Sequence, residues 1–191
     1  MIVVRHPPTA LNDPESERVR GWVDVPLTKD GKAQAHRVAE FFRFVGLGHN
    51  DWQVFSSPFE RTEYQAKAIA RTLGVGVKTD DRLKPWNLGD LQGQPVEKAY
   101  PVMRKLMKET PDEPAPGGES FNDFVERFRS FFDEHAECHD IIAVTHLRDI
   151  VLSKSLAERR GGVDPDIMDD WRTIGGIVLA KVGPEGFYPL L

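Results

Sequence analysis

Cysteine is nearly absent from this sequence. Cys138 is the only cysteine among 191 residues, so no disulfide can form within the chain, and this usage is typical of a reducing compartment. Because no second cysteine lies near it, Cys138 is expected to be a partly buried thiol near a helix end rather than a metal ligand or a nucleophile.

Long apolar runs are also missing. No run approaches the roughly 18 residues that a membrane-spanning helix requires. The apolar stretch at residues 1–4 is much too short to be a signal peptide. Together with the cysteine content, these absences predict a cytoplasmic protein without membrane contact.

Positive charge is not in excess. The chain has 25 Lys and Arg against 30 Asp and Glu, a formal net charge of −5. A broad nucleic-acid surface needs a basic excess, so we expect no nucleic-acid partner, although a local basic pocket is compatible with this charge. The sequence shows no repeat and no linker, and its length suits a single domain over residues 1–191.

The apolar runs that are present are short and alternate with helical patterns. They are continuous, as is typical of strands buried on both faces, and they occupy residues 1–4, 52–56, 75–79, 140–145 and 175–182. Helical patterns occupy residues 28–45, 58–73, 117–135 and 146–158. This alternation predicts an α/β fold, a three-layer α/β/α sandwich with a mostly parallel central sheet. Residues 85–118, rich in proline, glycine and charge, are expected to pass over the sheet edge around one helical piece.

Apolar spacing indicates which helix faces are buried. Thr28 is the expected N-cap of the first helix, and Pro58 suits the first turn of the second. The first helix should bury one face, formed by Val38, Phe41, Phe42 and Val45. The stripe on the helix at 117–135 predicts core packing rather than a cofactor site, and consists of Phe121, Phe124, Val125, Phe128, Phe131 and Phe132.

Polar residues stand at the ends of three predicted strands. These are residues 5–6 after the first strand, 56–61 after the second and 145–146 after the fourth. Ligands of such sheets gather at the carboxyl ends of the strands. We therefore expect these three segments to meet in one pocket.

The side chains in these segments suit phosphoryl transfer. The guanidinium groups of Arg5 and Arg61 match the oxygens of a phosphoryl group. A neutral His6 can attack phosphorus and hold the phosphoryl group, while a protonated His146 would donate a hydrogen bond to its oxygens. The rival interpretations are histidines that merely end strands and a zinc site. No metal is predicted, because neither histidine has an acidic or thiol ligand at suitable spacing.

Five segments carry known motifs in a known order. "VVRHPPTALN" resembles an Arg-His-Gly-x-Thr-x-x-Asn opening, and "RVRGWVDVPLTKDGKAQA" is similar to the segment that follows it. "FSSPFERTEYQAKAIA" is similar to a Ser-Ser-Pro-x-x-Arg block, "PGGESFNDFVERF" to a Gly-Glu-Ser helix start, and "IIAVTHLRDIV" to a segment with a second histidine. Over nearly its whole length the chain thus resembles the histidine phosphatase superfamily, which contains cofactor-dependent phosphoglycerate mutase and many small phosphatases.

The resemblance implies a role for each matched position. His6 would be the phosphorylated nucleophile, and Arg5, Arg61 and His146 would bind the transferred phosphoryl group. Asn12 and the backbone after His146 would assist. Further candidate substrate contacts are Thr9, Gly21, Leu147 and Arg148. The resemblance implies neither a metal nor an organic cofactor, and the expected substrate is a phosphorylated small molecule, with a phosphoprotein as the alternative.

The chain departs from the family pattern at three places. Pro7 replaces the glycine after the first histidine and Pro8 a residue that is often glutamate, so the loop is stiffened and a backbone N–H is lost. Pro85 stands where the family commonly has a proton-donating glutamate, and proline cannot donate a proton. After the second histidine, His146, the chain has Leu147 and Arg148 where the family usually has small residues. The candidates for the missing acid are Asp24, Asp90, Glu119 and Asp149.

These observations predict a phosphatase that works through a phosphohistidine on His6. Its substrate would be a phosphate monoester, a phosphoanhydride or a phosphoramidate, and good leaving groups are favoured because Pro85 supplies no proton. The alternative is a phosphate-binding or regulatory protein with impaired turnover, and a phosphoglycerate mutase is a weaker candidate. Arg18 and Arg20 are equally compatible with a solvated loop and with substrate contact.

Overall fold

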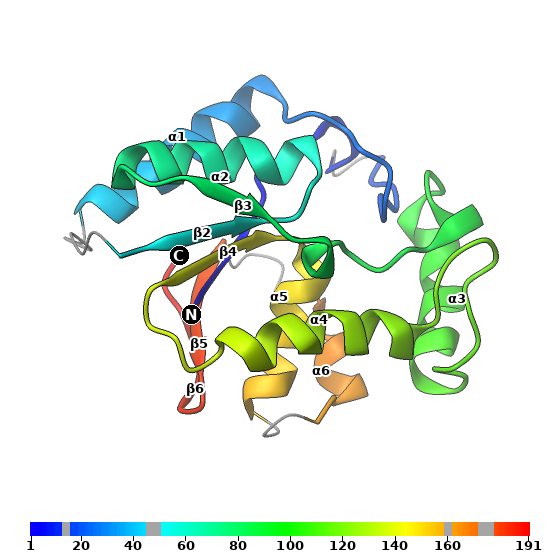
Figure 1. The fold of residues 1–191 in the computed structure, drawn as a ribbon. Coiled ribbons are helices and arrows are strands. Elements are labelled where there is room, and N and C mark those ends of the chain that lie inside the picture. Colours follow the sequence, from blue (N-terminus) through cyan, green and yellow to red (C-terminus); the bar gives the residue numbers. More distant parts are fainter. Residues whose placement is uncertain (13–15, 45–50, 159–161, 172–177) are drawn as a thin grey trace.

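Six strands form one sheet in the computed structural model, which describes residues 1–12, 16–44, 51–158, 162–171 and 178–191 (Figure 1). The order across the sheet is β3-β2-β4-β1-β5-β6. The strands are β1 (Ile2–Arg5), β2 (Gln53–Ser56), β3 (Val77–Thr79), β4 (Ile141–Thr145), β5 (Leu179–Gly183) and β6 (Gly186–Pro189).

The sheet is mostly parallel, as predicted. Strands β1 to β4 run parallel to one another, whereas β5 is antiparallel to both β1 and β6. The predicted strand at 175–182 corresponds to β5, and residues 175–177 lie outside the described residues. The sequence did not predict β6, a short edge strand that ends on Pro189; proline is confined to such edges because it cannot donate to the ladder.

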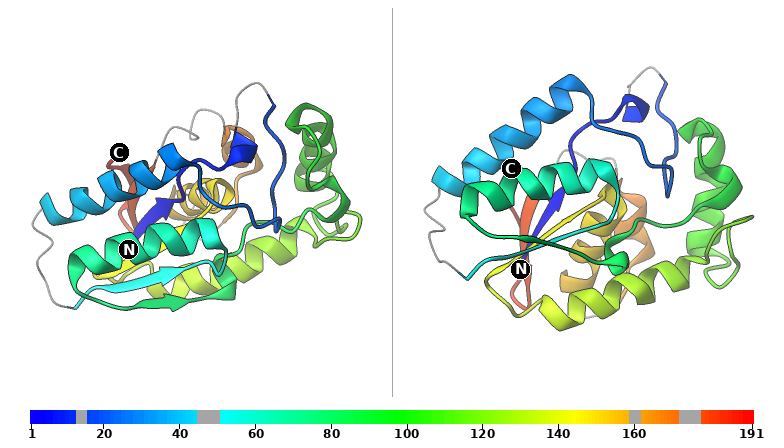
Figure 2. Two further views of the ribbon diagram at one scale, coloured as in Figure 1. Left: turned by 90° about the horizontal axis from the view of Figure 1, so that it is seen from above. Right: turned by 45° about the horizontal axis from the view of Figure 1, so that its top comes forward.

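Helices cover both faces of the sheet, which gives the three predicted layers (Figures 1 and 2). On one face, α1 (Lys29–Phe44) and α2 (Glu60–Leu73) lie side by side. On the other face are α4 (Phe121–His135), α5 (Leu147–Glu158) and the short α6 (Pro165–Asp169). None of the helices in the described part of the chain is long and apolar enough to cross a membrane.

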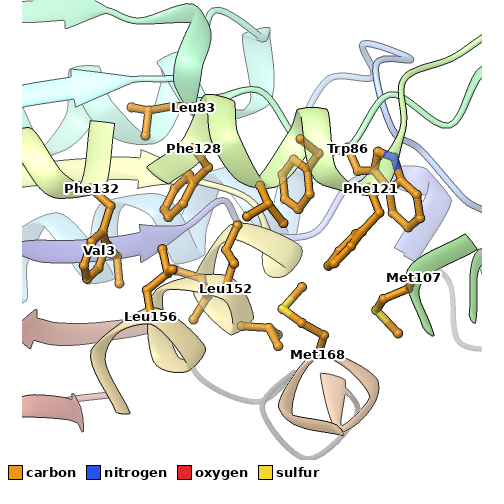
Figure 3. Packing of buried hydrophobic residues seen from close by; sticks show 14 of the residues in the cluster. Val3, Leu83, Trp86, Met107, Phe121, Phe128, Phe132, Leu152, Leu156 and Met168 are labelled. Atoms are coloured by element: carbon orange, nitrogen blue, oxygen red, sulfur yellow. The ribbon is translucent and has the colours of Figure 1, made fainter. Parts of the chain in front are cut away.

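Both faces of the central strands are buried, which explains their continuous apolar runs. In β1, Ile2 and Val4 pack with α1 and α2, whereas Val3 faces the opposite way. Figure 3 shows Val3 among side chains of α4 and α5, including Phe128 and Leu152. All six residues of the predicted apolar stripe of α4 are buried, so that prediction is confirmed.

The helix boundaries follow local chemistry. Thr28 caps α1, since its Oγ accepts a hydrogen bond from the N–H of Gly31 at 3.0 Å, and Ser120 and Asp123 form a capping box at α4. The second helix begins at Glu60 rather than Pro58, because Phe59 is still extended, with φ −80° and ψ 144°. On α1, Val38 and Phe42 are buried as expected. Phe41 is only partly buried, and Val45 lies outside the described residues.

The excursion between the two halves of the chain holds one long helix, α3 (Val96–Lys108), at the far end of the molecule in Figure 1. Three short 3-10 turns complete the structure: η1 (Ala10–Asn12), η2 (Asp81–Leu83) and η3 (Gly89–Leu91). Gly89 has φ 49°, and a Cβ there would lie 2.1 Å from the carbonyl oxygen of Pro116, so the excursion closes on itself only with glycine at this position. Cys138, beyond the end of α4, is free and partly buried as predicted.

Candidate active site

The two predicted histidines meet because their strands are neighbours. Arg5 of β1 pairs with Thr145 of β4, and His6 and His146 each follow one residue later. The N–H of His6 also donates to the carbonyl of Thr145 at 3.0 Å. The two imidazole rings lie edge to face, with centroids 5.2 Å apart. The structure therefore brings together residues that are 140 positions apart in the sequence.

His6 has the protonation state that a nucleophile needs. Its side chain is buried, and burial, followed by the charges of Arg20, Arg61 and Arg5, lowers its pKa well below the usual value. Its Nδ1 lies 2.7 Å from the carbonyl oxygen of Pro7. A carbonyl only accepts, so Nδ1 carries the proton and Nε2 keeps its lone pair. His6 is thus a neutral imidazole with a free Nε2.

The two prolines after His6 contribute through their carbonyl groups. Pro7 accepts the Nδ1 proton of His6, and Pro8 accepts from the N–H of Thr28 at 3.2 Å. A Cβ on Gly31 would lie 2.3 Å from the oxygen of Pro8, which shows how closely the loop approaches the start of α1. The N–H groups that proline lacks are not required for these contacts. The prolines fix the loop while its acceptors hold the nucleophile and the helix start.

His146 is buried at the end of β4 and pairs with a serine that follows β2. Its Nε2 lies 3.0 Å from Oγ of Ser57. Burial, followed by the charges of Arg61 and the proximity of His6, lowers the pKa of His146 well below the usual value. The hydrogen bond considered from the sequence requires a protonated His146, whereas this environment favours the neutral imidazole. Negative charge on a bound phosphoryl group would favour the protonated form.

Arg61 is held rigidly with one donor to spare. Its side chain is only 1% exposed, and its Nη atoms donate to the carbonyl oxygens of Gly21 and Val23 at 2.9 Å each. Asp24 adds a contact of 3.3 Å to Nη1. The buried Nε has no hydrogen-bond partner among the described residues. Burial lowers the pKa of Arg61 to about 10, so the group is still charged at neutral pH.

Arg20 also faces the histidines. Its Nη1 is buried and has no hydrogen-bond partner in the described part of the chain. Burial, together with the charges of Arg5 and Arg61, lowers its pKa to about 10. Unpaired guanidinium donors in a buried site are costly unless an anion accepts from them. Arg20 and Arg61 thus make the inner end of the site an anion-binding position.

These residues line a cavity of about 100 Å³. The end at the carboxyl edge of the sheet, called the inner end, contains His6 and His146 and owes its positive charge to Arg20 and Arg61. Its outer wall is largely apolar and contains Pro85, Trp86, Leu88, Val96, Tyr100, Met103, Leu147 and Trp171. A charged group thus fits at the inner end, and an apolar or aromatic group fits beside the wall.

Three of the predicted substrate contacts line the cavity. They are Gly21, Leu147 and Arg148. The guanidinium group of Arg148 lies over the rings of Tyr100 and Trp171, 5.9 and 5.7 Å from their centroids, and donates to the carbonyl of Met168 at 2.9 Å. Burial lowers the pKa of Arg148 to about 10, so it remains a cation. Arg18, which the sequence left open, lines the cavity as well.

The other predicted residues are not among those that line the cavity. Oδ1 of Asn12 accepts from the N–H of Thr9 at 2.9 Å and from its hydroxyl at 3.2 Å, which fixes the turn after His6. Arg5 does not line the cavity, but its charge contributes to the low pKa of His6. Asn12 and Thr9 thus fix the nucleophile loop, and Arg5 adds positive charge beside His6.

None of the four candidates for the missing acid lines the cavity. Asp24 accepts from the N–H of Glu60 at the start of α2, and Asp90 lies beside Gly117. Glu119 pairs with Arg127 at 2.7 Å. Asp149 is fully buried, and burial raises its pKa well above the usual value.

The lining residues include one carboxyl group that the sequence did not indicate, that of Glu17. No signal in the sequence indicated Glu17, because this residue lies in no matched motif and directly precedes the segment that begins with Arg18. Among the described residues, no group of three or more His, Cys, Asp or Glu side chains could hold a metal ion.

Comparisons with known proteins support the family resemblance. The model of the histidine phosphatase superfamily (branch 1) matches residues 1–172. A probable phosphoglycerate mutase from Yersinia enterocolitica is 35% identical over 141 residues, which cover 72% of this chain and 63% of that protein. This chain therefore spans less than two thirds of the length of that curated relative.

Solved structures show the same fold. The phosphoglycerate mutase from Thermus thermophilus has a TM-score of 0.62 at 27% identity, covering 86% of each chain. A mycobacterial glucosyl-3-phosphoglycerate phosphatase has a TM-score of 0.70 at 24% identity, covering 94% of this chain and 87% of the other. The second likeness concerns the fold alone. Both confirm the predicted phosphoglycerate mutase-like architecture.

Proposed function

The chain belongs to the histidine phosphatase superfamily, and we propose that it is a phosphatase that moves the phosphoryl group of a small molecule first to His6 and then to water. The observation that carries the proposal is the state of His6. Its Nδ1 proton is held by the carbonyl of Pro7, so a free Nε2 faces a cavity that also contains unpaired arginine donors.

The proposed reaction has two displacements at phosphorus. Nε2 of His6 attacks, the bond to the leaving group breaks, and a phosphohistidine forms. Arg20 and Arg61 stabilise the charge on the phosphoryl oxygens as it develops, and because two backbone carbonyls hold Arg61, little reorganisation of that group is required. Water then attacks phosphorus from the vacated side, which releases phosphate and regenerates neutral His6.

The cavity supports a substrate with an apolar or aromatic portion next to the phosphate. Beyond the cationic end the wall is formed by side chains such as Leu88, Tyr100 and Trp171. The substrate we propose is a phosphorylated small molecule, and a phosphoprotein that inserts its modified side chain is the alternative. Phosphate monoesters, phosphoanhydrides and phosphoramidates all carry a phosphoryl group that the inner end can bind. We expect the reaction to need neither a metal nor an organic cofactor.

Release of phosphate from p-nitrophenyl phosphate between pH 4 and 9 tests the proposal. Wild type should turn over, His6→Ala should not, and acid-quenched wild type should carry a phosphoryl mass that is missing from His6→Ala. His36→Ala is the matched control, because His36 is exposed on α1 and does not line the cavity.

Two results would contradict the proposal. Equal turnover by wild type and His6→Ala would exclude His6 as the nucleophile. Phosphate binding without turnover at any pH would favour the binding protein, and isomerisation of phosphoglycerate without phosphate release would favour the mutase activity attributed to the curated relatives.

A further inference from the structure

The reaction needs a proton donor, and this chain has a proline where the family commonly has a proton-donating glutamate. Pro85 occupies that position and lines the cavity, so the wall has no ionisable group there. An alkoxide or phenoxide that departs from phosphorus is a strong base, and protonation of it by a positioned side chain lowers the barrier. The donor must share the cavity with His6.

Glu17 meets this requirement. It contributes the only carboxyl group among the cavity-lining residues of the described chain. The Glu17 residue is half-buried. Resting on the proposed phosphatase activity, we propose that Glu17 is the general acid that protonates the leaving group.

The backbone fixes the position of Glu17 opposite the excursion. Its carbonyl accepts from the N–H of Val96 at 3.1 Å, and the N–H of Val19 donates to the carbonyl of Gln94 at 2.9 Å. Between them, Arg18 and Pro95 form an antiparallel bridge. This short ladder places Glu17 beside Val96, and both residues line the cavity that His6 shares.

The charges around Glu17 connect it with the phosphoryl position. Its carboxylate stabilises the cationic forms of Arg5 and Arg20, whose pKa values it raises against the effect of burial. A phosphoryl dianion bound at the inner end would take over these cations and place its own negative charge beside the carboxylate. The carboxyl group of Glu17 thus lies within electrostatic reach of the phosphoryl position.

The proton balance closes over the two steps. In the first, Nε2 of His6 bonds to phosphorus, the bond from phosphorus to the leaving oxygen breaks, and the proton of Glu17 moves to that oxygen. In the second, the Glu17 carboxylate accepts a proton from the attacking water, the oxygen bonds to phosphorus, and the bond to Nε2 breaks. Neutral His6 and protonated Glu17 are regenerated, and no further reactant is needed.

A leaving-group series separates this role from a structural one. Glu17→Gln should lower kcat/KM about 100-fold or more for phenyl phosphate and for an alkyl phosphate, whose leaving groups need a proton. For p-nitrophenyl phosphate, with its good leaving group, the loss should stay within about threefold. Glu97→Gln is the matched control: Glu97 is exposed at the start of α3 and does not line the cavity, so its removal should change neither value.

The outcomes distinguish this inference from the proposed function. An equal loss for all three substrates, or no loss for any, with a normal phosphohistidine on His6, would overturn the role of Glu17 and leave the phosphatase intact. The absence of both turnover and phosphoenzyme from wild type would overturn the two together. Circular dichroism and the unfolding temperature of Glu17→Gln, compared with wild type, show that a selective loss is not a folding defect.

Discussion

Acidification should destabilise the protein through the same two histidines that face the cavity. His6 and His146 are each only 4% exposed, and burial holds the pKa of both well below the ordinary 6.5. The folded state therefore keeps them neutral, whereas the unfolded chain protonates them as the pH falls below about 6.5. Because the unfolded state then binds more protons than the folded state, the free energy of unfolding must decrease as the pH decreases.

The size of this effect follows from protonation of the unfolded chain. For a histidine that stays neutral in the fold, the free energy of unfolding drops by about 1.4 kcal/mol between pH 7.5 and 5.5. Two such residues approach about 3 kcal/mol, a large part of the roughly 5–15 kcal/mol that stabilises a domain. With ring centroids 5.2 Å apart, the two histidines titrate as a pair, so their effects do not simply add.

Urea unfolding at several pH values measures the effect. The buffer must be free of phosphate, because an anion bound to the folded state would raise its stability. His6→Gln and His146→Gln should each lose about 1.4 kcal/mol less than wild type between pH 7.5 and 5.5.

Asp149→Asn provides a control of opposite sign. Burial raises the pKa of Asp149 well above 3.8, so the folded protein retains a proton on this carboxyl group that the unfolded chain gives up. Removal of the carboxyl group should therefore make the free energy of unfolding decrease more steeply on acidification. A pH dependence in both histidine variants identical to that of wild type would refute the neutral nucleophile.

Two further predictions concern the cavity wall. Pro85→Glu in the Glu17→Gln background should restore the hydrolysis of phenyl phosphate at least about 10-fold, since both positions line the cavity, and an unimproved rate would place position 85 out of reach of the leaving oxygen. Arg148→Ala should raise KM about 10-fold for an aryl phosphate that carries a carboxylate, because a charge-assisted hydrogen bond is lost, and should leave KM for phenyl phosphate within about twofold. An equal rise in KM for the two substrates would contradict a contact between Arg148 and the substrate carboxylate.

The layered fold could be predicted because burial leaves a direct mark on the sequence. The runs at 1–4 and 140–145 are mostly apolar, since alternate side chains of β1 and β4 enter cores on opposite faces. The aromatic stripe of α4 marked its buried face in the same way. Element boundaries and short elements were harder to predict from the sequence. The helix α6 has five residues and one buried side chain, which are too few for a periodic pattern, and β6 is a brief edge strand.

The phosphoryl site could be predicted in its parts but not in its contacts. Arg61, His6 and His146 stood out because each lies in a motif, and the strand order then brought them together. The partner of the His6 Nδ1 proton is a backbone carbonyl, which no residue type reveals. Glu17 could not be found because the ladder between residues 17–19 and 94–96 is a tertiary contact between two irregular segments.

The position of β1 in the sheet has a consequence for synthesis on the ribosome. Residues 2–5 are made long before both neighbours of this strand, β4 at residues 141–145 and β5 at residues 179–183. Until residue 141 has emerged, both hydrogen-bonding edges of a largely apolar segment have no partner from the sheet. Such edges invite pairing with other chains. Protection of nascent β1 from other chains should therefore raise the yield of folded protein.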